Sequence, residues 1–118
     1  MIAIPFGAIV LTDSPFTDLS AAKRRPALVS STDNERRTDV IVGYITSMPR
    51  EDGDAMPIAP TAGTGLKALS LVRFDKIATL NKEIVAGRIG DADPSWLANA
   101  REVFFGVFGF GRPGGSRQ

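Results

Sequence analysis

The stretch from residue 7 to residue 30 reads GAIVLTDSPFTDLSAAKRRPALVS, and its pattern determines the expected beginning of the fold. The apolar run over 9–11 follows a glycine and is typical of a short buried strand. Residues 13–25 are rich in Pro, Ser, Thr, Asp and basic side chains, which predicts a long polar loop. Residues 26–30 are again mainly apolar and predict a second strand.

Further short strands are predicted along the chain on both sides of polar breaks. Residues 39–46 are rich in β-branched and aromatic side chains and form the most distinct strand pattern. Residues 69–74 and 84–89 are predicted as two more strands. A wholly polar turn is expected at 33–38, and glycine and proline clusters predict an irregular, mobile segment over 50–65.

The pattern changes to a helix near the end of the chain. Asp93 suits the N-cap and Pro94 the first helical position. Gly109 is a predicted helix cap, and we expect residues 1–110 to form a single domain followed by a flexible tail at 111–118. Apolar side chains at spacings of three and four form one stripe: Trp96, Leu97, Ala100, Val103, Phe104, Val107 and Phe108. Short strands followed by one amphipathic helix predict a small β-barrel with a packed helix.

Composition limits the chemistry that this chain can perform. It has 118 residues, of which 43% are hydrophobic, so one well-packed domain is expected. The absence of cysteine excludes disulfides and thiol catalysis, and the absence of histidine removes the commonest general base and metal ligand. No metal site or cofactor is predicted. The net charge of +1 carries no global signature of nucleic-acid binding, and no apolar run is long enough to span a membrane, so we expect a cytoplasmic protein.

Two groups of side chains are candidates for binding phosphate. Lys23, Arg24 and Arg25 form the densest basic cluster, directly before Pro26. They fit a phosphate clamp, because guanidinium groups match phosphate oxygens, but a run of three also fits a solvated loop. The pair 46–47 ends the most distinct strand with two hydroxyl groups. These hydroxyls suit either a phosphate contact or the capping of a turn.

Arg73 and Asp75 are the candidates for acid and base chemistry. They are two residues apart on a predicted strand, so both side chains point to one face of the sheet. One interpretation is a structural ion pair. The other is a general acid and base pair, because a ribose 2′-hydroxyl needs a base and a carboxylate can supply one where histidine is absent.

The chain resembles the PemK/MazF family of type II toxins. The quoted stretch carries the resemblance through a Gly-x-Ile-Val strand, a Pro-Phe-Thr-Asp-Leu-Ser loop and the Lys-Arg-Arg-Pro-Ala-Leu-Val entry to the next strand. The resemblance extends over about residues 7–90 in the family's order, and its later parts are residues 39–42, 45–47, 65–67, 72–76 and 77–80.

The resemblance implies a mainly β SH3-like barrel with a C-terminal helix, a homodimer, and an endoribonuclease neutralised by a cognate antitoxin. It implies metal-independent cleavage of single-stranded RNA, in which the 2′-hydroxyl attacks the adjacent phosphorus and leaves a 2′,3′-cyclic phosphate. The implied catalytic residues are Arg25, Thr46, Arg73 and Asp75. The predicted RNA-binding residues are Thr17, Lys23, Arg24 and Ser47.

This chain also departs from the family pattern. Ala8 stands where an acidic residue is usual, Ser14 stands where phenylalanine is usual, and Ala78 replaces an arginine found in several members. Two other functions remain compatible with the same fold: a gyrase-poisoning toxin, and an RNA-binding homologue without catalysis. A gyrase poison would not need the Arg-Pro motif or the Thr-Ser strand end.

Overall fold

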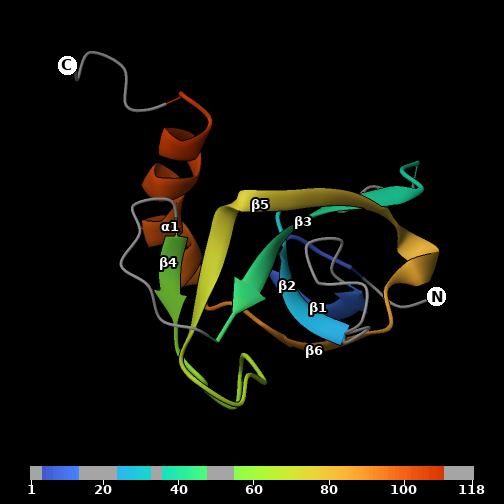
Figure 1. The fold of residues 1–118 in the computed structure, drawn as a ribbon, viewed down its shortest axis with the longest axis horizontal. Coiled ribbons are helices and arrows are strands. Elements are labelled where there is room, and N and C mark those ends of the chain that lie inside the picture. Colours follow the sequence, from blue (N-terminus) through green and yellow to red (C-terminus); the bar gives the residue numbers. More distant parts are fainter. Residues whose placement is uncertain (1–3, 14–23, 33–35, 48–54, 111–118) are drawn as a thin grey trace.

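The structure is a computed structural model, and it describes residues 4–13, 24–32, 36–47 and 55–110. These residues form one antiparallel sheet with the strand order β4-β5-β3-β2-β1-β6, which curls into a half-barrel with a single α-helix on its outside (Figure 1). The elements are β1 (Ala8–Asp13), β2 (Arg24–Val29), β3 (Asp39–Thr46), β4 (Ala55–Ile58), β5 (Ser70–Asn81), the 3₁₀ turn η1 (Lys82–Ile84), β6 (Gly87–Asp91) and α1 (Pro94–Val107).

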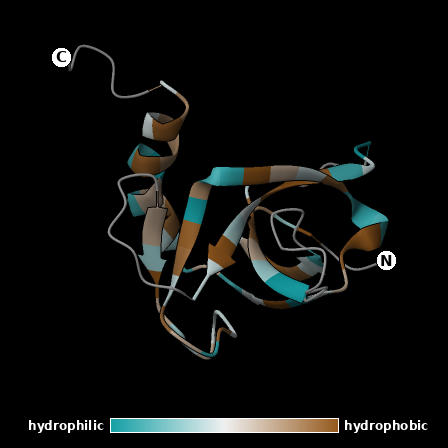
Figure 2. Cartoon of the chain, in the orientation of Figure 1, coloured by the Kyte–Doolittle hydropathy of each residue, from teal (hydrophilic) through white to brown (hydrophobic). Residues whose placement is uncertain are grey.

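A bulge in β5 produces the curl. Tyr44 pairs with Arg73, yet the preceding residue of β3, Gly43, pairs with Ile77. Residues 74–76 are therefore extra residues on β5, and such a bulge bends a strand and increases its twist. Figure 2 shows a hydrophilic segment at the place where β5 bends. The sequence predicted this strand only as far as residue 74, because the exposed charges after it interrupt the apolar pattern.

The two faces of the curled sheet carry separate apolar clusters. The inner face is lined by Ile4, Ala8, Val10, Ala27, Val29, Val40, Val42, Tyr44 and Val85. The outer face of the sheet carries Ile9, Leu28, Ile45, Ile58, Val72 and Phe74, which form the second cluster together with Ala92 and with Ala100 of α1. Other apolar side chains of α1 pack against this cluster. Adjacent residues of a strand point to opposite faces, so β1, β2, β3 and β5 each contribute to both clusters.

The helix follows the sequence prediction at both ends. Asp93 occupies the N-cap position with Pro94 directly after it. At the other end, Gly109 has a φ of 76°, which glycine adopts readily. The Gly109 and Phe110 amides donate to the carbonyls of Gly106 and Phe105, respectively, in the pattern of a Schellman motif. α1 lies against β4 and β5, so its packing fixes that side of the sheet.

Two strand predictions need correction. The irregular segment expected at 50–65 contains the strand β4, whose proline at position 57 is tolerated because β4 is an edge strand. The strand expected at 84–89 is shifted towards β6, because Asn81 caps the 3₁₀ turn and leaves the Ile84 side chain 55% exposed. The predicted tail at 111–118 and most of the predicted loop at 13–25 lie outside the described residues.

Candidate active site

One end of the inner face is polar where the rest of that face is apolar. Val10 pairs with Ala27, and Ala27 pairs with Tyr44, so these three apolar residues form a row across β1, β2 and β3. Two residues further along, Thr12 pairs with Arg25. Because side chains alternate along a strand, Thr12 and Arg25 point to the same face as the apolar row.

The same register brings Thr46 towards Arg25. The pairing of β2 with β3 ends at Ala27 and Tyr44. Arg25 and Thr46 each lie two residues beyond this pair on their own strand, so their side chains point to the same face as Ala27 and Tyr44. On the other side of β3, Tyr44 pairs with Arg73. The predicted residues Arg25, Thr46 and Arg73 therefore share one end of one face, although they come from three strands.

Arg73 and Asp75 form a bidentate ion pair. The Arg73 Nε donates to Asp75 Oδ1 at 2.9 Å, and Nη2 donates to Oδ2 at 2.7 Å. The Arg73 side chain is 10% exposed and that of Asp75 is 28% exposed, so the pair is only partly in contact with solvent. The predicted contact between these two side chains is thus present in the structure.

The contact with Arg73 changes the acidity of Asp75. The hydrogen bonds from the Arg73 guanidinium hold the pKa of Asp75 below its ordinary value, and the opposing effect of partial burial is smaller. Asp75 is therefore ionised at neutral pH, but a carboxylate with a lowered pKa is a weaker proton acceptor. This property matters for the choice between a catalytic base and a structural ion pair.

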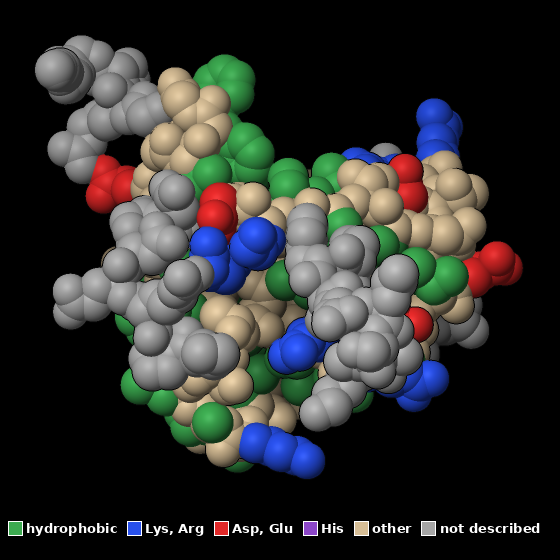
Figure 3. All heavy atoms as spheres, viewed as in Figure 1, with side chains coloured by type: hydrophobic (Ala, Val, Ile, Leu, Met, Phe, Trp, Pro, Cys, Tyr) green, Lys and Arg blue, Asp and Glu red, His purple; other side chains and the backbone are tan. Residues whose placement is uncertain are grey.

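Other predicted RNA-binding residues lie in different places. Arg24 is exposed and directly precedes Arg25 on β2, so its side chain points to the opposite face. Ser47 is exposed directly after the end of β3, next to Thr46. Thr17 and Lys23 lie outside the described residues. In Figure 3, basic side chains gather in the middle of the view between β5 and β2, next to acidic ones.

Sequence reasoning did not identify Thr12 and Tyr44 as members of this site. The Tyr44 hydroxyl donates to the Asp13 carbonyl oxygen at 3.0 Å and so ties β3 to the end of β1. Burial and the nearby Asp13 carboxylate raise the pKa of Tyr44. Alternation back from Thr46 would have indicated Tyr44, whereas Thr12 joins the site only through its pairing with Arg25.

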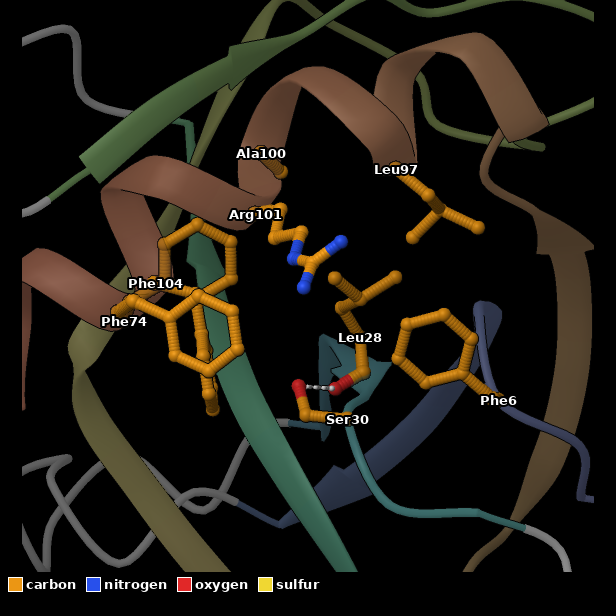
Figure 4. Close-up of a pocket in the computed structure, with 9 residues that line it drawn as sticks. Phe6, Leu28, Ser30, Phe74, Leu97, Ala100, Arg101 and Phe104 are labelled. Carbon is orange, nitrogen blue, oxygen red and sulfur yellow. Dashed lines mark hydrogen bonds between the residues drawn. The ribbon is translucent and has the colours of Figure 1, made fainter. Parts of the chain in front are cut away.

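A second candidate region is an apolar pocket on the outer face, beside α1. It has a volume of about 300 Å³. Phe6, Leu28, Leu97 and Phe104 contribute much of its apolar wall, and the Arg101 guanidinium points into it (Figure 4). The Arg101 guanidinium also lies 5.4 Å from the centre of the Phe105 ring. The pocket therefore combines an apolar wall with one cation.

Within the described residues, no three acidic side chains come together as a possible metal-binding group. None of the helices in this part of the chain is long and apolar enough to cross a membrane.

Several solved structures share this fold. A Mycobacterial endoribonuclease in complex with its cognate antitoxin superposes with a TM-score of 0.76 at 19% identity, over 92% of this chain and 98% of that chain. The Mycobacterium tuberculosis toxin MazF-mt6 gives a TM-score of 0.72 at 23% identity, over 89% and 99% of the two chains. MazF from Deinococcus radiodurans gives 0.72 at 21% identity, over 92% and 99%. At these identities the likeness establishes the fold.

The family follows from the sequence itself. The model of the PemK-like, MazF-like toxins of type II toxin-antitoxin systems matches residues 6–104, which include all six strands of the described sheet and most of α1. The chain therefore belongs to this family of toxins, and the resemblance stated from its motifs is confirmed. Among curated protein sequences, none is significantly similar to this chain.

Replacing Asp75 with asparagine tests the ion pair. We expect Asp75→Asn to lower the free energy of unfolding by about 1–3 kcal/mol at pH 7, because it removes a charge-assisted pair and leaves Arg73 uncompensated. Asp75 has a lowered pKa in the folded state, so its stabilisation is present above the unfolded value of 3.8 and is lost as the pH falls through the folded pKa. The difference between the two proteins should therefore shrink below pH 3.8.

Urea unfolding followed by circular dichroism at a series of pH values measures this difference. The control is Asp39→Asn, which breaks the more exposed pair with Arg37 and should cost much less at pH 7. A difference between wild type and Asp75→Asn that stays constant down to the lowest pH would contradict the expectation.

Proposed function

We propose that this toxin is a metal-independent, sequence-selective endoribonuclease that cleaves single-stranded RNA by attack of a 2′-hydroxyl on the adjacent phosphorus. The observation that carries this proposal is the position of Arg25, Thr46, Arg73 and Asp75 at one end of one face. Two guanidinium groups, one hydroxyl and one carboxylate are sufficient for a transesterification of this kind. Two of the similar structures are those of a Mycobacterial endoribonuclease, which supports the same activity for this chain.

Each of the four residues has a distinct proposed role. Arg25 stabilises the negative charge of the pentacovalent phosphorane and protonates the leaving 5′-oxygen, while Thr46 donates its hydroxyl to a phosphate oxygen. Asp75 removes the proton of the 2′-hydroxyl, and Arg73 orients Asp75. The 2′-oxygen then bonds to phosphorus, the bond to the 5′-oxygen breaks, and the product carries a 2′,3′-cyclic phosphate.

The role of Asp75 has a specific alternative. Its lowered pKa makes it a weak base, and both of its oxygens accept hydrogen bonds from Arg73. In the alternative role, the carboxylate acts only as a structural partner that holds the Arg73 guanidinium beside the bound phosphate. The two roles predict different activities for a variant that keeps the shape and loses the basicity.

We also propose a homodimer that is neutralised by a cognate antitoxin in the cytoplasm. The similar Mycobacterial structure contains a cognate antitoxin, which supports such a partner here. A monomer of net charge +1 attracts RNA weakly, whereas a two-fold dimer places two copies of the site in one assembly.

The outer face offers material for the proposed dimer interface. α1 packs against β4 and β5, and the pocket beside it lies over the neighbouring part of the sheet at Leu28 (Figure 4). Phe6 lines this pocket and is 52% exposed, and Phe108 at the end of α1 is 38% exposed. An isologous contact over this region would bury apolar surface that a monomer leaves in water.

We expect Arg25→Ala to reduce RNA cleavage at least ~10²–10³-fold, because it removes a donor that stabilises the transition-state charge. The measurement is the rate of cleavage of a long RNA, with sequencing of the cleavage ends and a parallel reaction in the presence of EDTA. The matched control is Arg37→Ala, at the opposite end of β3, whose loss should leave the rate unchanged.

Full activity of Arg25→Ala would contradict the catalytic role of Arg25. Toxicity of the wild type without any RNA cleavage would favour a gyrase poison.

We expect Asp75→Asn to reduce cleavage strongly, because asparagine cannot accept the proton of the 2′-hydroxyl. The rate is measured at a temperature well below the thermal unfolding of the variant, so that a loss of stability does not lower it. If the variant cleaves RNA at the wild-type rate and only its stability falls, the structural role of Asp75 replaces the catalytic one.

We expect Phe6→Glu to convert the dimer to a monomer, because the substitution places a charge in the apolar contact. Sedimentation velocity at micromolar concentration measures the mass of the particle. The control is Ile84→Glu, which has a similarly exposed side chain (55% against 52%) but lies in η1, away from the pocket, and should remain dimeric. A wild-type species of 12.6 kDa that is fully active on RNA would refute the dimer.

A further inference from the structure

Two buried polar atoms at the site lack hydrogen-bond partners. Within the described residues, these atoms are the hydroxyl oxygen of Thr12 and the Nε of Arg25. Thr12 is only 1% exposed, so water does not readily satisfy its hydroxyl. Buried polar groups in folded proteins almost always have partners, and an exception points to a strained or functional site.

The two atoms belong to side chains that face each other. Thr12 and Arg25 are direct partners in the pairing of β1 with β2, and side chains paired in this way lie on the same face, with their Cβ atoms about 5 Å apart. A hydroxyl oxygen can accept a hydrogen bond, and Nε of arginine can only donate one. The two unsatisfied groups are therefore complementary as acceptor and donor.

We propose that Thr12 is a positioning residue for Arg25, on the basis of the nuclease function proposed above. When a phosphodiester binds, the Thr12 hydroxyl oxygen accepts a hydrogen bond from Arg25 Nε. Both outer nitrogens of the guanidinium then remain available for phosphate oxygens.

The neighbouring side chains support Thr12 as the acceptor. The Tyr44 hydroxyl is already bonded to the Asp13 carbonyl oxygen, and Thr46 on the other side of Arg25 already has an interaction of its own. Arg73 shows the contrasting arrangement, because Asp75 engages its Nε and one outer nitrogen together. Arg25 instead pairs across the sheet with Thr12, whose hydroxyl has no hydrogen-bond partner among the described residues. A hydrogen bond from Nε to this hydroxyl would leave both outer nitrogens of the Arg25 guanidinium for the substrate.

The first experiment compares Thr12→Val with Thr12→Ser. Valine has nearly the same shape and lacks the hydroxyl, so single-turnover cleavage should fall about tenfold, while serine should stay close to the wild-type rate. The thermal midpoint of Thr12→Val should stay the same or rise, because a methyl group replaces an unpaired buried hydroxyl. If the Thr12 hydroxyl had only a structural role, its removal would lower the thermal midpoint.

Thr64→Val is the matched control for such a structural hydroxyl. Thr64 is also buried, but its hydroxyl donates to the Ala59 carbonyl oxygen at 2.9 Å. Its removal should lower the thermal midpoint and leave the cleavage rate unchanged at low temperature. Wild-type activity of Thr12→Val, or a fall in its thermal midpoint like that of Thr64→Val, would overturn the proposal.

A second experiment tests whether Thr12 acts through Arg25. Lysine has no Nε–H group of this kind, so Thr12→Val should weaken binding in the wild-type background and have no further effect in Arg25→Lys. Fluorescence anisotropy with an RNA whose reactive 2′-hydroxyl is replaced by hydrogen measures this binding without cleavage. Equal losses in both backgrounds would overturn the positioning role. Full cleavage by Arg25→Ala would instead refute the catalytic role of Arg25, and the absence of any RNA cleavage by the wild type would refute the proposed nuclease function.

Discussion

The pairing of β3 with β5 is the constraint on which the rest of the structure depends. Tyr44 pairs with Arg73 and Gly43 with Ile77, so three residues of β5 form a bulge at which the strand bends. Because β5 bends there, it pairs with β3 in the curled sheet and also with the edge strand β4, which lies beside α1 (Figure 1).

The curl separates an inner face, which ends in polar side chains, from an outer face, which packs the helix and carries the apolar pocket. The polar end of the inner face carries two arginines, Arg25 and Arg73, in a chain whose net charge is only +1. Arg73 is neutralised by Asp75, whereas the Nε of Arg25 stays buried without a partner in the described part of the chain. Buried polar groups without hydrogen-bond partners lower the stability of a fold. Their position at one end of the sheet is typical of a functional site.

Local patterns in the sequence determined much of this arrangement. Asp93 and Pro94 begin the helix, Gly109 ends it, and the apolar stripe between them identifies its packed face. Helix signals of this kind act within a few residues, so they can be interpreted without the rest of the fold. The same holds for Arg73 and Asp75, because alternation along one strand is enough to bring them together.

Only the tertiary structure decided how the strands meet. The pairing of Thr12 with Arg25 and the pairing of Tyr44 with Arg73 join segments far apart in the chain, and strand propensity contains no information about register. The bulge in β5 and the short edge strand β4 escaped prediction for the same reason, since their stability comes from neighbouring strands and from α1. The sequence thus determined which side chains could perform the chemistry. The non-local hydrogen bonds of the sheet decided which of them face one another.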